Sequence, residues 1–211
     1  MSMNLKEQFF DVLDGYRGER EIDMHAVFDA IKELNIKSSH ELAQLFSMAS
    51  NRISGYSSLF VFDEKIISFI QKLCDGFEGK DILIPWAEAG VLAKSVEESK
   101  PKHLRCLDAE QVHGSFLKHV LDNSEVVVDD PYQNILEDSS QYDLILGCPS
   151  FNHGPREVYE HDNICIKPSY SDCLIAACLE KLKDNGLAVF IVPPSFVIRK
   201  GDSHSFWKNA N

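Results

Sequence analysis

The sequence predicts an α/β fold in which a parallel sheet carries helices on both faces. Short apolar runs suited to strands alternate with amphipathic segments suited to helices from about residue 64 to residue 192. Such alternation implies right-handed crossovers between parallel strands. Small, acidic or aromatic residues follow the apolar runs, where open α/β sheets bind their ligands. A shorter helical region is expected in front of this sheet.

Composition sets limits on the function. The 211 residues allow one or two domains and a sizeable core. The longest apolar run, residues 187–192, is far too short to span a bilayer, and the polar residues after Met1 do not resemble a signal peptide. We therefore expect a cytoplasmic protein without a membrane partner. The six cysteines show neither a CxxC pair nor zinc-ligand spacing, which predicts reduced thiols and no metal site.

The strongly negative net charge of the chain limits its possible partners. The formal net charge is −12, and no basic run occurs in the chain. Phosphate backbones are bound by clustered lysine and arginine. DNA is therefore expected as a partner only if an additional domain or subunit supplies the positive surface.

Residues 1–53 are predicted to form a helical N-terminal region, and residues 54–211 an α/β domain. Apolar residues recur at helical spacing between residues 5 and 49, and Ser38 is placed to begin one of these helices. In the second region helices are expected at residues 64–73, 89–96, 116–120 and 174–182. The expected strands cover residues 81–85, 103–108, 125–130, 142–146 and 187–192.

The end of the fourth expected strand is the most informative segment. An apolar run stops at a turn that would expose carbonyl groups and an aromatic face at the carboxyl edge of the sheet. The candidate catalytic residues of this turn are Cys148, Pro149, Ser150 and Phe151. A nucleophilic Cys148 would need a nearby base and a lowered pKa, and only His153 and His161 are close in sequence. Covalent catalysis is therefore not expected.

Three other loops carry candidate nucleotide-binding residues. After the first strand, Ala87 and Gly90 are small enough for a ligand to approach backbone N–H groups at a helix start. After the second strand, Glu110 could accept hydrogen bonds from ribose hydroxyls. After the third, Asp129 or Asp130 could accept one from an adenine amino group. Each loop also has a plainer interpretation as an ordinary turn or solvated cap.

The order of these loops resembles the class I S-adenosylmethionine-dependent methyltransferases. More narrowly, it resembles the DNA adenine-N6 methyltransferase family, which includes the modification subunits of restriction systems. The family's first turn reads Asp-Pro-x-x-Gly-x-Gly, and its fourth strand ends in Asn-Pro-Pro-Phe or Asn-Pro-Pro-Tyr. Pro85, Gly90, Pro149 and Phe151 match these motifs. The matching region runs from about residue 54 to the last residue, and residues 186–193 resemble the fifth strand of the family.

The resemblance implies a cofactor and a set of contacts. S-adenosylmethionine would be the cofactor, and a flipped adenine would be held by the carbonyl of Pro149 and the ring of Phe151. The aromatic segment before the first helix would add Phe60. The implied cofactor residues are Phe60, Pro85, Ala87, Gly90, Glu110, Asp129 and Asp130.

Departures from the family pattern leave two functions open. Ile84 replaces the acid of the first turn, Glu88 replaces its first glycine, and Cys148 replaces the catalytic asparagine. The chain could be an S-adenosylmethionine-dependent DNA adenine-N6 methyltransferase, or a non-catalytic scaffold or interaction subunit that binds a protein partner. A dehydrogenase-type nucleotide site is a weaker alternative, because residues 86–89 lack its glycine-rich turn. Since the family continues beyond Lys200, we expect an incomplete sheet and a piece of a longer protein.

Overall fold

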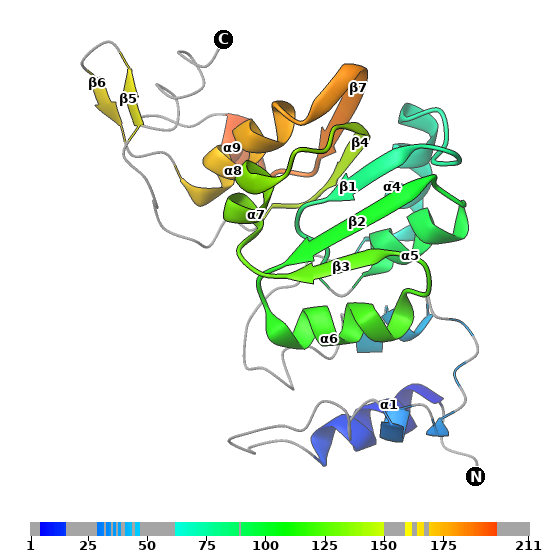
Figure 1. Ribbon diagram of the computed structural model, residues 1–211. Helices are drawn as coiled ribbons and strands as arrows, with labels where there is room; N and C mark the ends of the chain where they lie inside the picture. Colours follow the sequence, from blue (N-terminus) through cyan, green and yellow to red (C-terminus); the bar gives the residue numbers. More distant parts are fainter. Residues whose placement is uncertain are drawn as a thin grey trace.

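The computed structural model describes residues 5–15, 29–31, 33–34, 36, 38, 41–43, 45–46, 62–88, 90–149, 159–161, 164–166 and 169–197. A five-stranded sheet in the order β3-β2-β1-β4-β7 forms its centre, and all neighbouring strands are parallel (Figure 1). The strands are β1 (Asp81–Ile84), β2 (His103–Asp108), β3 (Glu125–Val128), β4 (Tyr142–Gly147) and β7 (Leu182–Phe190). A separate antiparallel hairpin joins β5 (Tyr159–His161) to β6 (Ile164–Ile166).

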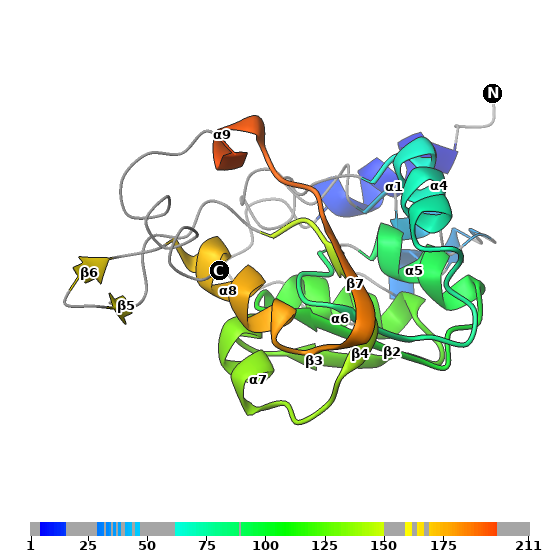
Figure 2. The ribbon, with the colours of Figure 1, turned by 90° about the horizontal axis from the view of Figure 1, so that it is seen from above.

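Alternating side chains along the strands bury both faces of the sheet. Ile82 and Ile84 of β1 share one core cluster, whereas Leu83 between them belongs to the other. The first cluster includes side chains of α4 (Glu64–Leu73), α5 (Val91–Glu98) and α6 (Gln111–Val120). The second includes side chains of α7 (Pro131–Glu137) and α8 (Tyr170–Leu179), which lie on the opposite side from α4 and α5 (Figure 2). The predicted parallel sheet with helices on both faces is confirmed.

Local capping explains where the helices begin. Asp63 accepts a hydrogen bond from the Lys65 amide at the start of α4. At the start of α8, the hydroxyl of Ser169 accepts from the Asp172 amide while the Asp172 carboxylate accepts from the Ser169 amide. This reciprocal arrangement is a capping box. A last short helix, α9 (Pro194–Val197), follows β7.

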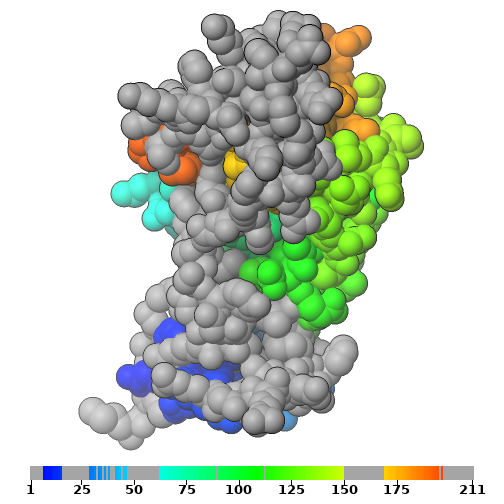
Figure 3. Space-filling model, turned by 90° about the vertical axis from the view of Figure 1, so that its left-hand side faces the viewer, coloured from blue at the N-terminus to red at the C-terminus, as the bar shows by residue number. Residues whose placement is uncertain are grey.

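The N-terminal region contains α1 (Leu5–Asp14) and further helical residues at 29–31, 33, 41–43 and 45–46. Ser38 does precede a helical segment, because its hydroxyl accepts from the Glu41 amide at 3.2 Å. The rings of Phe46 and Phe116 stack with 3.8 Å between centroids and 9° between planes, joining this region to α6. Figure 3 shows α1, in blue, at the opposite end of the molecule from β7, in orange.

Several element boundaries differ from the predictions. The third strand ends at Val128 rather than residue 130, because Asp130 becomes the N-cap of the unpredicted helix α7. The fifth strand begins at Leu182, five residues before the apolar run that starts at residue 187. Leu182 already pairs with Tyr142, and a register shift separates this pair from the rest of the β4–β7 pairing. Helices α5 and α8 are each displaced by a few residues. The hairpin of β5 and β6 was not predicted.

The sheet has an exposed edge, and the described cysteines are free thiols. Within the described part of the chain, β7 lies at the edge of the sheet, which is therefore open on that side. The described helices include none with the length and apolar character needed to cross a membrane. The cysteines described are free thiols, and Cys74, Cys106, Cys173 and Cys178 are buried, as predicted.

Candidate ligand site at the carboxyl edge of the sheet

The strand order creates a switch point beside β1. The chain passes from β1 through α5 to β2 on one side, and β4 pairs with the other side of β1. Crevices outside the carboxyl ends of such strands are where open α/β folds bind ligands. The loops that follow β1, β2, β3 and β4 all lie at this edge because the strands are parallel.

The turn after β1 has a backbone shape suited to glycine. Glu88 and Gly90 have φ angles of 49° and 76°, in the left-handed region. Glu88 therefore adopts a backbone conformation that glycine takes freely and that a larger side chain disfavours. A Cβ atom on Gly90 would come within 2.7 Å of Leu117 Cδ2. Gly90 therefore suits both the left-handed N-cap of α5 and the close approach to α6, where an added Cβ would make the Leu117 side chain shift.

A buried carboxylate ties this turn to its neighbour. Asp108, the last residue of β2, has no exposed surface. Its Oδ2 accepts from the Glu88 amide at 2.7 Å, and its Oδ1 accepts from the Glu110 amide at 2.8 Å. The Nδ1 atom of buried His113 lies 3.2 Å from the same Oδ1 and must donate, because a carboxylate oxygen can only accept.

The acidic residues predicted to hold the nucleoside lie in different surroundings. Glu110 is half-buried before α6, and Asp129 is exposed after β3, where its amide donates to the Asp108 carbonyl at 3.0 Å. Asp130 is occupied in a different way. Its Oδ1 accepts from the Tyr132 amide at 3.0 Å and the Tyr170 hydroxyl at 2.8 Å. That carboxylate therefore caps α7 and joins it to α8.

The end of β4 faces the turn after β1. Cys148 is half-buried and Pro149 is buried. Burial, followed by the nearby negative charge of Glu88, raises the pKa of Cys148 to about 12. A thiol with so high a pKa is not an activated nucleophile.

The predicted site residues that the structure describes lie in the loops of one edge of the sheet. They are Pro85, Ala87, Gly90, Glu110, Asp129, Asp130, Cys148 and Pro149. Trp86, in the same turn as Pro85 and Ala87, packs edge-to-face on Tyr170, with 6.0 Å between ring centroids, in the core on the α7–α8 side. The predicted residues Phe60, Ser150 and Phe151 lie outside the described part of the chain.

Asp108 and His113 were missed by the sequence reasoning. The alternation of side chains along β2 could have indicated the burial of Asp108. Leu104 and Cys106 face the α4–α6 side of the sheet, and Asp108, two residues after Cys106, points to the same side. A carboxylate aimed at that buried face must find hydrogen-bond donors. The described residues hold no group of histidine, cysteine and acidic side chains arranged for a metal ion.

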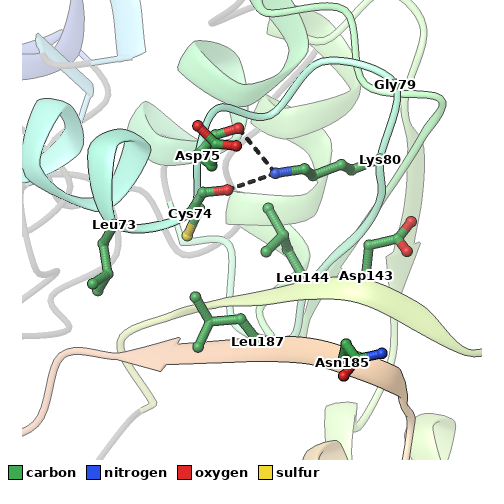
Figure 4. A pocket seen from close by; sticks show the side chains of 9 residues that line it. All are labelled: Leu73, Cys74, Asp75, Gly79, Lys80, Asp143, Leu144, Asn185 and Leu187. Carbon is green, nitrogen blue, oxygen red and sulfur yellow. Dashed lines mark hydrogen bonds between the residues drawn. The ribbon is translucent and has the colours of Figure 1, made fainter.

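A hollow lies at the opposite edge of the sheet. This cavity of about 400 Å³ is lined by Leu73, Cys74, Asp75, Gly79, Lys80, Asp143, Leu144, Asn185 and Leu187 (Figure 4). The Lys80 ammonium donates to the carbonyls of Cys74, Asp75 and Gly76 at 2.5, 3.1 and 2.9 Å. Lys80 therefore caps the carboxyl end of α4, and the cavity is separate from the carboxyl-edge site.

The fold is an open α/β architecture, and solved structures described as S-adenosylmethionine-dependent methyltransferases share it. A structure from Vibrio vulnificus, provisionally described as the modification subunit of a type I restriction enzyme, matches with a TM-score of 0.62 and 16% identity. That match covers 94% of this chain and 53% of the other, so the chain spans about half the length of that subunit.

Two further structures share the fold. A Listeria monocytogenes protein, provisionally described as a class I S-adenosylmethionine-dependent methyltransferase, matches with a TM-score of 0.64 and 14% identity over 97% of this chain and 78% of its own. A Methanobacterium thermoautotrophicum protein described as precorrin 8W decarboxylase matches with a TM-score of 0.53 and 10% identity over 66% of this chain and 69% of its own. No family model and no curated protein matches the sequence.

Proposed function

We propose that this chain is the cofactor-binding part of an S-adenosylmethionine-dependent DNA adenine-N6 methyltransferase. One observation carries the proposal: the loops after β1, β2, β3 and β4 meet at the switch point, with acidic residues after β2 and β3 and a proline after β4. Nucleoside cofactors are bound at such an edge by carboxylates and by helix N-termini. The structural likeness to methyltransferases supports the same assignment.

The residues present fit the nucleoside half of the cofactor. Glu110 is the candidate acceptor for the ribose hydroxyls, and exposed Asp129 is the candidate for the adenine amino group. Asp130 is a poorer candidate, because its Oδ1 accepts hydrogen bonds from Tyr132 and Tyr170 and joins α7 to α8, whereas the Oδ1 of exposed Asp129 accepts from the neighbouring Asp130 amide at 2.7 Å. The backbone around Gly90, at the start of α5, would approach the ligand from the side of β1.

The methionine part of the cofactor would lie near the carboxylate of Glu88. S-adenosylmethionine carries a sulfonium and an ammonium group as well as a carboxylate, whereas S-adenosylhomocysteine lacks the sulfonium charge. A largely buried carboxylate attracts the cations and repels the anion. We therefore expect the chain to prefer S-adenosylmethionine to S-adenosylhomocysteine, and the substitution Glu88→Gln to reduce that preference.

The target base would be held at the end of β4. The carbonyl of Pro149 would accept a hydrogen bond from the exocyclic amine, and Phe151 would stack on the ring. Cys148 offers only a weak sulfur acceptor where the family has an amide oxygen. Loss of one oriented partner typically costs about 3 kcal/mol of transition-state stabilisation, so a slow methyltransferase is expected. The acidic chain would need another domain or subunit for DNA binding.

Calorimetric titration with S-adenosylmethionine tests the cofactor assignment. We expect binding by the wild type and a loss of about tenfold or more in Glu110→Gln, because a charged hydrogen-bond acceptor is removed. Glu137→Gln is the matched control, since this exposed residue ends α7, far from the loop after β2. Equal losses in both variants would contradict the role of Glu110.

A non-catalytic scaffold is the second candidate function. The observation favouring it is the negative charge of Glu88, which adds to the raised pKa of Cys148, in a turn where the methyltransferase motif has glycine. No binding at millimolar S-adenosylmethionine would favour the scaffold and reject the cofactor proposal for this chain. Transfer of a labelled methyl group to adenine in DNA, in the presence of the partner subunit, would reject the scaffold.

A further inference from the structure

We propose that Asp108 is a positioning residue that fixes the loops of the carboxyl-edge site. The inference rests on the proposed cofactor site and adds a residue to it. Asp108 has no exposed surface, and both of its carboxylate oxygens accept hydrogen bonds from the chain. Its three side-chain partners belong to the turn after β1, to the loop after β2 and to the first turn of α6.

Asp108 stabilises the turn after β1. Glu88 is held at a φ of 49°, a conformation that costs a non-glycine residue about 1–2 kcal/mol. The 2.7 Å hydrogen bond from its amide to Asp108 Oδ2 is charge-assisted and shielded from water. This bond stabilises the turn in the shape that a glycine would otherwise adopt freely.

Asp108 also holds the loop that carries Glu110, the candidate acceptor for the ribose hydroxyls. The Glu110 amide donates to Asp108 Oδ1 at 2.8 Å, directly before α6 begins. His113, one turn further on, donates to the same oxygen and fixes the rotation of the carboxylate. The Asp108 backbone carbonyl also accepts from the Asp129 amide at 3.0 Å. One residue thus sets the position of Glu88, Glu110 and Asp129 together.

The substitution Asp108→Asn tests this role. An amide has one acceptor oxygen for three donors, so at least one loop must lose its hydrogen bond. We expect the affinity for S-adenosylmethionine to fall about tenfold or more. The control is Asp143→Asn, because Asp143 also accepts a strand-end amide, that of Asp81 at 2.8 Å, but at the amino edge. The control should change cofactor affinity less than about twofold, within the range of an ordinary structural substitution.

A second measurement does not depend on the ligand. In the wild type, the amide hydrogens of Glu88 and Glu110 should exchange slowly with solvent, as amide hydrogens in buried hydrogen bonds do. Asp108→Asn should accelerate exchange at these two amides while leaving β1 and β4 protected. Fast exchange of both amides in the wild type would overturn the proposal even if the variant does not fold.

The two assays separate the possible failures. Equal losses of affinity in Asp108→Asn and Asp143→Asn would overturn the positioning role, because the effect would then follow stability alone. A wild type that shows protected amides but no binding of S-adenosylmethionine would instead reject the proposed function. Protected amides with a selective loss of affinity in Asp108→Asn are the expected result.

Discussion

At the scale of single residues, the site depends on backbone conformations that side chains disfavour. Gly90 and Glu88 both adopt positive φ angles within one turn. A Cβ atom on Gly90 would make the buried Leu117 side chain shift, whereas Glu88 is held by the carboxylate of Asp108. The turn therefore combines one glycine with one supported residue in place of the two glycines of the methyltransferase motif.

Substitution of Gly90 by alanine should be more destabilising than its backbone angle alone requires. We expect Gly90→Ala to reduce the free energy of unfolding by about 3 kcal/mol, from the left-handed backbone and the clash with Leu117. Gly76→Ala is the matched control, since Gly76 has a φ of 77° and nothing within 4 Å of the added Cβ. The control should lose about 1 kcal/mol in urea denaturation. Equal losses would show that packing against α6 is unimportant.

The thiol of Cys148 should react slowly with iodoacetamide. Its pKa of about 12 means that the reactive thiolate increases about tenfold per pH unit from pH 8 to pH 10, without a plateau. Glu88→Gln removes a negative charge that opposes the thiolate, which lowers the pKa and should accelerate labelling at fixed pH. Peptide mass spectrometry under native conditions measures the rate. Cys178 is the control, because burial alone raises its pKa and Glu88→Gln should leave it unchanged.

At the scale of helices and strands, the apolar pattern predicted the elements better than their ends. The helix at residues 64–73 and the strand at residues 103–108 were predicted with the observed bounds. The helix α7 was missed because Asp130 and Pro131 also suit a turn, and only the Tyr170 hydroxyl on a distant helix settles their role. The Asp108 network was missed for the same reason, since its donors come from separate loops.

The capping box of α8 should contribute measurably to stability. Ser169→Ala removes the acceptor for the Asp172 amide and a 2.6 Å hydrogen bond to the fully buried Asp172 carboxylate. We expect a loss of about 2 kcal/mol in the free energy of unfolding, at the upper end for an N-cap. Ser99→Ala removes only a 3.1 Å bond to the Ser95 carbonyl and should cost about 0.5 kcal/mol. Equal costs would contradict a role for the reciprocal cap.

At the scale of the whole molecule, we propose that residues 1–53 form a helical region that folds together with the α/β domain. Phe46 and Phe116 are both fully buried and stack on each other. Phe9 and Leu13 of α1 belong to the same core cluster as the residues of α5 and α6. A continuous core of this kind favours one cooperative unfolding transition.

Loss of the Phe46 ring should therefore destabilise both regions. We expect Phe46→Ala to reduce the free energy of unfolding by about 3–5 kcal/mol, as for other large-to-small changes in a core. Phe69→Ala is the control, because Phe69 on α4 is 64% exposed and should cost about 0.5 kcal/mol. Urea denaturation followed by circular dichroism and by tryptophan fluorescence should give coincident transitions in the wild type. Separate transitions would show that the two regions unfold independently.

The order of the strands also has a consequence for how the chain acquires its structure. The half formed by β1, β2 and β3 is contiguous in sequence and can assemble early. The other flank of β1 must wait for β4, and the bond from the Asp81 amide to Asp143 spans 62 residues. Pairings between such distant segments form slowly. Since the switch point lies between β1 and β4, the ability to bind a ligand should arise last, after the first three strands have already assembled.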